Sequence, residues 1–386
     1  MSAAPFIVFG APDIEDAEIQ EVLATMRSGW LGTGPRVAAF EKAFAELKNA
    51  QPAQVAAVSS CTAALHLSFV AAGLKAGDEV ITSPLTFCAT ANAILHTGAT
   101  PVLADVDPAT MNIDPARIAD RIGPRTRAIV PVHFAGLPCD MDAIGALARK
   151  HGLAVVEDCA HAVEALYRGE PTGTLGDFGC FSFYVTKNVT SGEGGMVLAK
   201  SERDAERIRM LALHGMTRDA WKRFSDEGFK PYQVVEAGFK YNMMDLQAAI
   251  GIHQLARVQA GWERRRLLWA RYQQAFAALP VALPLEPPAH VRHGLHLYTL
   301  RIDKARCGIG RDAFLNRMTR AGIGVGVHYT ALPEHPYYQQ TLGWRPEDTP
   351  HATAIGRETV SLPLSPKLTE GEAQRVIDAV HAALDA

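Results

Sequence analysis

The chain has 386 residues, of which 48% are hydrophobic and 20% are charged, a composition typical of a globular protein with a large core. Its formal net charge of −3 gives no general attraction to nucleic acid or to an anionic membrane surface. No apolar run reaches transmembrane length, and the first residues lack the basic and apolar segments of a signal peptide, so we expect a cytoplasmic location and no membrane partner.

The six cysteines are scattered and form no C-x-x-C pair, which argues against a metal cluster and against a disulfide framework. Two helices are predicted at about 13–27 and 36–48, separated by the glycine-rich segment GWLGTGP at 29–35. So many glycines and a proline are incompatible with regular helix or strand. The segment is either a plain connector or, around Trp30, part of a pocket lining, and both interpretations stay open.

From residue 55 onward, strand-like runs alternate with segments that have helical apolar spacing. This alternation predicts an α/β fold class with a mainly parallel sheet covered by helices on both faces. Ligands of such sheets bind at the carboxyl ends of the strands. Strands are predicted at 55–60, 79–84, 101–107, 127–134 and 153–158.

Three of these strands end in residues suited to a ligand site. The turn SSCTAA (59–64) offers backbone N–H groups and a helix N-terminus to a phosphate, although an ordinary helix cap explains it as well. Phe87 stands at a strand-to-helix junction, where it either stacks on a ligand or packs in the core. Asp158 ends the apolar run LAVVED, where a carboxylate needs a partner such as a protonated ring nitrogen, or else caps a helix.

The stretch FGCFSFYVTKNVTSGEGGMVL (178–198) predicts a strand, a polar glycine-rich loop and a second strand. Lys187 stands at the head of that loop. A lysine at the end of a buried strand loses part of its charge through desolvation and becomes an amine nucleophile. Schiff-base chemistry with pyridoxal phosphate (PLP) is the leading use of such an amine. The alternative is a solvated loop lysine.

The remainder predicts a helix at about 202–213, an irregular and functional or mobile loop at 217–238, and one long helix from 245 to about 278. The cluster Arg264-Arg265-Arg266 on that helix is interpreted as a solvated face or a subunit contact. Prolines near 280–289 mark a domain boundary, giving a large domain over 1–279 and a smaller α+β domain over 280–386. The smaller domain is predicted to have strands at 296–303 and 324–329 and helices at 311–321 and 369–384.

Seven ordered blocks together resemble the DegT/DnrJ/EryC1 family of PLP-dependent sugar aminotransferases, which have PLP fold type I. The resemblance covers nearly the whole chain. The blocks are GWLGTGP (29–35), SSCTAALHL (59–67), TSPLTFCATANAI (82–94), VEDCAHAVEA (156–165), FSFYVTKNVTSGEGGMV (181–197), FKYNMMDLQAAIG (239–251) and VSLPLSPKLT (360–369).

The resemblance implies a role for each matching residue. Lys187 is the Schiff-base lysine, Asp158 pairs with the pyridine nitrogen, and His161 lies near the 3-hydroxyl of the ring, where many members have glutamine. Whether His161 donates or accepts a hydrogen bond is left open. The other implied cofactor contacts are the stacking ring of Phe87, the phosphate ligands Thr62, the Ala63 N–H and Ser182, and Asn242, which completes the phosphate site of the neighbouring subunit in a homodimer.

The implied reaction moves an amino group from L-glutamate, which becomes 2-oxoglutarate, to a keto group at C4 of a nucleotide-linked sugar. The blocks AHAVEA, HGMTRDAW and FKYN are most similar to the UDP-4-amino-4-deoxy-L-arabinose–oxoglutarate aminotransferase branch, which acts on a UDP-4-keto-pentose in lipid A modification. Branches acting on UDP-4-keto-6-deoxyhexoses share most blocks. Trp30, His328 and Tyr329 are candidate substrate contacts, with a core strand end as the alternative for the last two.

Three other functions are less consistent with the sequence. A pyridoxamine-phosphate-dependent sugar dehydratase would replace the lysine by histidine or add a cysteine cluster, and this chain does neither. A regulatory protein without turnover is disfavoured by the complete set Asp158, Ser182, Lys187 and Asn242. A fold type I enzyme acting on amino acids lacks an arginine clearly placed for an α-carboxylate.

Overall fold

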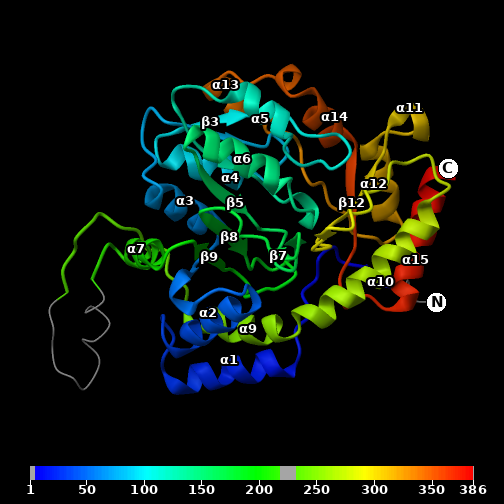
Figure 1. The fold of residues 1–386 in the computed structure, drawn as a ribbon. Helices are drawn as coiled ribbons and strands as arrows, with labels where there is room; N and C mark the ends of the chain where they lie inside the picture. Colours follow the sequence, from blue (N-terminus) through cyan, green and yellow to red (C-terminus); the bar gives the residue numbers. More distant parts are fainter. Residues whose placement is uncertain (1–4, 218–231, 386) are drawn as a thin grey trace.

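The computed structural model describes residues 5–217 and 232–385 (Figure 1). Most of the loop predicted at 217–238 lies outside the described residues. In the described ranges, no helix combines the length and apolarity needed to cross a bilayer.

A central seven-stranded sheet confirms the predicted α/β class with a mainly parallel sheet. The strand order is β1-β9-β8-β5-β4-β2-β3, and β9 alone among these strands runs antiparallel to its neighbours. The strands are β1 (Val55–Val58), β2 (Glu79–Thr82), β3 (Thr100–Leu103), β4 (Thr126–Val130), β5 (Ala154–Asp158), β8 (Phe178–Ser182) and β9 (Gly195–Ala199).

Helices cover both faces of this sheet because successive side chains of each buried strand point to opposite faces. Val156 packs on the face covered by α3 (Cys61–Ala71), α4 (Cys88–His96) and α7 (Glu202–Ala212). Val155 packs on the other face, with α5 (Pro115–Arg121) and α6 (Met141–His151). On that same face, β1, β8 and β9 are covered by α2 (Pro35–Leu47) and α9 (Asp245–Ala256), beside α1 (Asp16–Ser28) (Figure 1).

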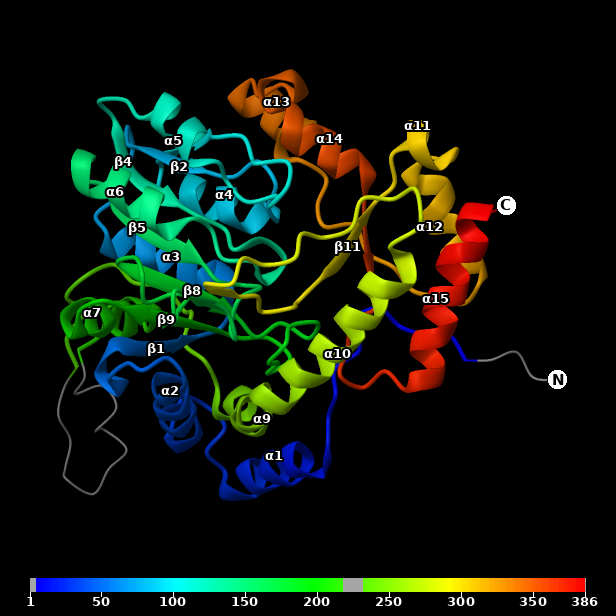
Figure 2. The same ribbon diagram turned by 45° about the vertical axis from the view of Figure 1, so that its right-hand side comes forward.

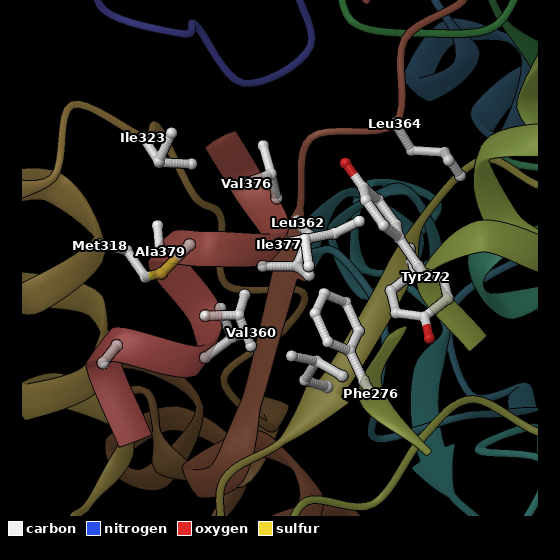
Figure 3. Packing of buried hydrophobic residues seen from close by; sticks show 14 of the residues in the cluster. Tyr272, Phe276, Met318, Ile323, Val360, Leu362, Leu364, Val376, Ile377 and Ala379 are labelled. Atoms are coloured by element: carbon white, nitrogen blue, oxygen red, sulfur yellow. The ribbon is translucent and has the colours of Figure 1, made fainter. Parts of the chain in front are cut away.

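Helix α10 (Val258–Phe276) connects this layered structure to the C-terminal part of the chain, and in Figure 2 it runs from α9 towards α15 (Glu370–Asp385). The predicted single helix is in fact two, because Arg257 between them leaves helical geometry with ψ near 3°. The second half of α10 contributes Tyr272 and Phe276 to a buried core with α15 and the strand β12 (Thr359–Leu362), as Figure 3 shows.

In this C-terminal core, β12 pairs antiparallel with β11 (Tyr298–Arg301). The prediction of a strand at 324–329 is wrong: its one described sheet contact is an isolated bridge between Gly326 and Ser361. The strand that pairs with β11 is instead formed by Thr359–Leu362. In the sequence, most of this run was identified only as the start of the block VSLPLSPKLT (360–369). The remaining helices here are α11 (Lys304–Cys307), α12 (Arg311–Arg320), α13 (Pro336–Leu342) and α14 (Pro350–Glu358).

Segments from the C-terminal part also pack back onto the large sheet layer. Ala331 and Ile355 share a buried cluster with Leu85 and Phe134, which follow β2 and β4. This contact brings residues 328–329 over the carboxyl ends of the strands. A domain boundary at 279–280 stays a prediction. The small elements are β6 (Leu166–Tyr167), β7 (Glu170–Pro171), β10 (Val291–Arg292), η1 (Pro52–Gln54), η2 (Phe134–Gly136), η3 (Leu332–Glu334) and η4 (Pro346–Asp348).

Candidate active site

A cavity of about 520 Å³ lies at the carboxyl ends of the parallel strands, within the size range of small-molecule sites. It brings together most of the residues singled out in the sequence, from four strand ends and from the C-terminal part. Those that line it are Thr62, Phe87, Asp158, His161, Ser182, Lys187, His328 and Tyr329.

Asp158 is the last residue of β5 and is only 5% exposed. Its Oδ2 accepts a hydrogen bond of 2.8 Å from Thr90 Oγ1, and its Oδ1 accepts one of 3.1 Å from the Ala160 N–H. Burial raises the pKa of Asp158, while these hydrogen bonds and the positive charge of Lys187 oppose that rise. The site therefore holds a buried carboxylate with fixed orientation that faces the cavity.

Lys187 follows β8 in the loop to β9, and its backbone N–H closes a turn on the Tyr184 carbonyl at 2.9 Å. Its amine lines the same cavity as Asp158. Loss of hydrating water lowers the pKa of Lys187 to about 8, although Cys61 and Asp158 act in the opposite direction. A lysine amine with this pKa is partly uncharged near neutral pH and can act as a nucleophile or a base.

The N-terminus of α3 forms another wall of the cavity. The Ala63 N–H donates to the Oγ of the N-cap residue Ser60 at 3.1 Å, so this N–H is already used by the helix cap. The N–H groups of Cys61 and Thr62 are in the first turn, where no helical carbonyl can accept them. Ser182, at the end of β8, pairs in register with Gly195 of β9, which lies against Ser60.

Phe87 places an apolar ring in the cavity rather than in the core. It is the N-cap residue of α4 and is 57% exposed, which is unusual for a phenylalanine at a buried strand end. Its ring centroid lies 5.9 Å from that of Tyr329. An exposed ring in a cavity is suited to stacking on a flat ligand.

The hydrogen bonds of His161 determine which of its ring nitrogens carries the proton. The Ala135 N–H donates to its Nδ1 at 3.3 Å, and Tyr329 Oη lies 3.0 Å from its Nε2. Burial, followed by the charge of Lys187, holds the pKa of His161 well below its usual value, so the ring is neutral. Because Nδ1 accepts, Nε2 carries the proton and donates to Tyr329. The Tyr329 hydroxyl then keeps its own proton for a partner in the cavity.

His328 is held by the C-terminal strand pair. Its Nδ1 lies 2.8 Å from Ser361 Oγ on β12. Burial, with a smaller effect of Lys187, lowers the pKa of His328 to about 4, so this imidazole is neutral as well. It therefore offers a neutral hydrogen-bonding group beside the lysine.

Asn242 and Trp30 do not line this cavity. Asn242 Nδ2 donates to Thr33 Oγ1 at 2.7 Å, and Trp30 Nε1 donates to the Thr33 carbonyl at 3.0 Å. The two predicted site residues therefore bond to the same residue, Thr33, outside the lining of this cavity, and Trp30 is 46% exposed.

The structure adds functional candidates that the sequence reading missed. Thr90 contacts Asp158 directly, and its position four residues after Thr86 on a helix start was the signal that could have indicated it. Asn188, next to Lys187, donates to Glu164 Oε1 at 3.0 Å and lies 3.0 Å from His296 Nδ1 through its Oδ1. These partners are distant in sequence, so no local pattern shows them.

A buried group of metal-ligand types lies behind Asp158, formed by His133, Glu157 and Cys159. Glu157 already accepts hydrogen bonds from His133 Nε2 at 2.9 Å and from the N–H groups of Gly173, Leu175 and Gly176 at 2.8, 2.8 and 2.7 Å. With its oxygens satisfied by these donors, Glu157 secures the turn before β8.

The chain matches the model of the DegT/DnrJ/EryC1/StrS aminotransferase family over residues 12–381. It is 47% identical over 377 residues to the spore coat polysaccharide biosynthesis protein SpsC of Bacillus subtilis (strain 168), a match that covers 97% of this chain and 96% of SpsC. The aminotransferase TlmJ from Streptoalloteichus hindustanus has a similar structure, with a TM-score of 0.90, 36% identity and coverage of 98% and 99% of the two chains.

The PLP form of Spr1654 from Streptococcus pneumoniae, assigned as a sugar aminotransferase, has a TM-score of 0.91, 31% identity and coverage of 98% and 99%. Spr1654 has also been solved in a pyridoxamine phosphate (PMP) form. The chain belongs to the DegT/DnrJ/EryC1/StrS aminotransferase family. Family membership makes it a PLP-dependent sugar aminotransferase.

The residues present fit this cofactor. The cavity combines an amine of lowered pKa, a buried carboxylate, an exposed aromatic ring and the free end of α3. These are the groups needed to bind an aldehyde, a ring nitrogen, a ring face and a phosphate.

Proposed function

We propose that this enzyme transfers the amino group of L-glutamate to a C4 keto group of a nucleotide-linked sugar, with a UDP-4-keto-pentose as the first candidate substrate. The observation that carries the proposal is the pair formed by Lys187 and Asp158, an amine of lowered pKa and an oriented buried carboxylate in one cavity. A UDP-4-keto-6-deoxyhexose is the alternative substrate.

In this proposal Lys187 holds the cofactor covalently through Nζ, and Asp158 faces its ring nitrogen. Phe87 covers one ring face, while Thr62, Ser182 and the first N–H groups of α3 bind the phosphate. The Ala63 N–H joins them only if it leaves Ser60 Oγ. Bound PLP supplies an electron sink and carries the amino group from donor to sugar.

The remaining steps use the chain's own groups. An ionised Asp158 keeps the facing ring nitrogen protonated. Lys187, with a pKa of about 8, exchanges protons as general base and acid at the reacting carbon. The Tyr329 hydroxyl, whose hydrogen is not used by His161, can donate to a hydroxyl or keto oxygen of the substrate, and His328 lines the same cavity.

A sugar nucleotide is supported by the site and by a relative. SpsC is named for polysaccharide biosynthesis, and polysaccharides are assembled from nucleotide-linked sugars. The cavity also has polar groups at Tyr329 and His328 that suit a hydroxyl-rich ligand. We therefore place this enzyme in the synthesis of an amino sugar for a surface glycan.

The test is an absorbance spectrum of the purified holoenzyme before and after addition of L-glutamate. We expect the band of enzyme-bound PLP to convert to the PMP spectrum with release of 2-oxoglutarate, and a UDP-4-keto-pentose to restore the band. Lys187→Ala should lack both the band and turnover. Lys200→Ala, which alters a lysine 73% exposed, is the matched control and should behave as wild type.

Three outcomes would contradict parts of the proposal. A holoenzyme that ignores glutamate would exclude this amino donor. Restoration of the band by a 6-deoxyhexose or thymidine-linked ketone, but not by the UDP-pentose, would replace the proposed substrate. Normal turnover in Lys187→Ala would exclude the proposed role of that lysine.

A further inference from the structure

Two threonine hydroxyls form a chain of hydrogen bonds that ends at the carboxylate of Asp158. Thr90 Oγ1 donates to Asp158 Oδ2 at 2.8 Å, and Thr86 Oγ1 lies 2.9 Å from Thr90 Oγ1. All three residues are buried, with exposures of 2% for Thr86, 1% for Thr90 and 5% for Asp158. The chain of contacts therefore lies out of bulk water, where each hydrogen bond carries more weight.

The direction of the hydrogen bonds follows from the number of protons. A threonine hydroxyl has one proton, and the proton of Thr90 is used by Asp158. Thr90 must therefore accept from Thr86, which donates its own proton. The donors point from Thr86 through Thr90 to the carboxylate, and a hydroxyl that accepts a bond becomes a better donor.

We propose that Thr90 is a positioning residue for Asp158 and that Thr86 supports it, so that this hydroxyl relay fixes the carboxylate facing the cofactor's ring nitrogen. The inference rests on the role of Asp158 in the proposed function. Neither threonine touches the reacting atoms in this proposal.

The relay has two effects on the carboxylate. Thr90 holds Oδ2 and the Ala160 N–H holds Oδ1, so the plane of the carboxylate is fixed from both sides. Burial raises the pKa of Asp158, and the bond from Thr90 is the main interaction that opposes this rise. A hydrogen bond to the charged form favours an ionised acid, which is the form that pairs with a protonated ring nitrogen.

The relay also connects the acid to the stacking ring. Thr86 and Thr90 stand on either side of Phe87, and the Thr90 N–H donates to the Phe87 carbonyl at 3.2 Å. One short segment at the start of α4 thus supports both the aromatic face and the carboxylate. A ring held between these two groups would be aligned by a single local structure.

The experiment compares valine and serine variants of the holoenzyme. Thr90→Val keeps the shape of the side chain but removes the hydroxyl, Thr90→Ser keeps the hydroxyl, and Thr86→Val removes only the supporting donor. Thr82→Val is the matched control, because Thr82 is also fully buried but donates to the Val130 carbonyl at 3.0 Å. The readouts are the dissociation constant of PLP from reconstituted apoprotein, the absorbance spectrum of bound PLP, and kcat.

We expect Thr90→Val to weaken PLP binding roughly tenfold, shift the spectrum of the bound cofactor and lower kcat, since a bond to a charged group is lost. Thr86→Val should act in the same direction with a smaller effect, roughly threefold. Thr90→Ser and Thr82→Val should bind PLP as wild type does. Thermal unfolding of the apoproteins identifies any variant that has lost its fold. If Thr90→Val has lost its fold, Thr90→Ser decides, because it keeps the hydroxyl and should still bind PLP as wild type does.

Equal behaviour of Thr90→Val and Thr82→Val would overturn the relay and leave the proposed function intact. A Thr90→Ser variant as weak as Thr90→Val would also overturn it, because methyl packing rather than the hydroxyl would then matter. A wild-type protein that binds no PLP would instead overturn the proposed function, and the relay with it.

Discussion

His161 shows how one buried side chain orients the groups around it. Its Nδ1 accepts from the Ala135 backbone and its Nε2 donates to Tyr329, so the imidazole is a neutral spacer between main chain and hydroxyl. The sequence left open whether this position donates or accepts a hydrogen bond. In the structure it does both: Nδ1 accepts and Nε2 donates. Its donor faces Tyr329, and Tyr329 faces the cavity.

A glutamine at position 161 can replace both bonds, because an amide has one acceptor and one donor group. We expect His161→Gln to retain most of kcat/KM. His161→Leu should lower kcat/KM by roughly tenfold or more and destabilise the fold by about 1–3 kcal/mol, since it leaves the Ala135 N–H buried without a partner. Steady-state kinetics and urea unfolding measure the two effects.

If His161→Leu matched His161→Gln in both measurements, the two hydrogen bonds of His161 would contribute neither to activity nor to stability. Tyr329→Phe provides a second check. It removes the proton offered to the cavity and also the acceptor of the buried His161 Nε2–H, while the aromatic ring is kept. We therefore expect kcat/KM to fall and the free energy of unfolding to decrease by about 1–3 kcal/mol.

At the scale of elements, the contact between β9 and α3 sets the phosphate end of the cavity. Gly195 pairs with Val58 of β1 on one side and with Ser182 of β8 on the other. A Cβ built on Gly195 would lie 2.4 Å from the carbonyl carbon of Ser60. The absence of a side chain at 195 therefore lets the first turn of α3 come close to Ser182.

Replacing Gly195 by alanine should force the strand and the helix start apart, because the clash is with backbone atoms. We expect Gly195→Ala to lower the free energy of unfolding of the apoprotein by about 1–3 kcal/mol and to weaken PLP binding. Urea unfolding and PLP titration measure these changes.

Gly371→Ala is the matched control, because a Cβ at this position in α15 has no heavy atom within 4 Å. It should leave PLP binding unchanged. Unaltered PLP binding in a folded Gly195→Ala protein would show that the close approach of β9 and α3 does not shape the phosphate site.

At the scale of the whole molecule, the site combines strand ends from the first half of the chain with His328 and Tyr329 from the C-terminal part. Trp30 and Asn242 share a surface around Thr33 that does not line the cavity of their own chain. A homodimer in which this surface completes the partner's site stays a prediction, and subunit mixing tests it directly.

Lys187→Ala and Asn242→Leu chains should each have low activity alone, since each lacks one residue of every site. A mixed dimer should regain activity above both parents, because one of its sites has Lys187 from one chain and Asn242 from the other. Activity after co-refolding, compared with the separately refolded parents, gives the measurement. If mixing restores nothing while both chains still form dimers, Asn242 acts within its own subunit or not at all.

The local pattern of the sequence determined much of this protein. The strands of the main sheet, the position of Lys187 after β8 and that of Asp158 at the end of β5 follow from apolar alternation and from where it stops. A buried strand must be apolar in a regular way, so a charged residue at its end is visible without a structure. The family resemblance was recognisable from the same segments and is confirmed.

Only the tertiary structure decided which distant segments meet. It paired Thr359–Leu362 with β11 and left 324–329 without a strand, broke the long helix at Arg257, and set Thr90 against Asp158. It also determined that His161 carries its proton on Nε2, because Nδ1 accepts from Ala135 and Nε2 faces Tyr329. These outcomes depend on pairing and burial between residues far apart in the chain, and a local pattern carries no information about its partner.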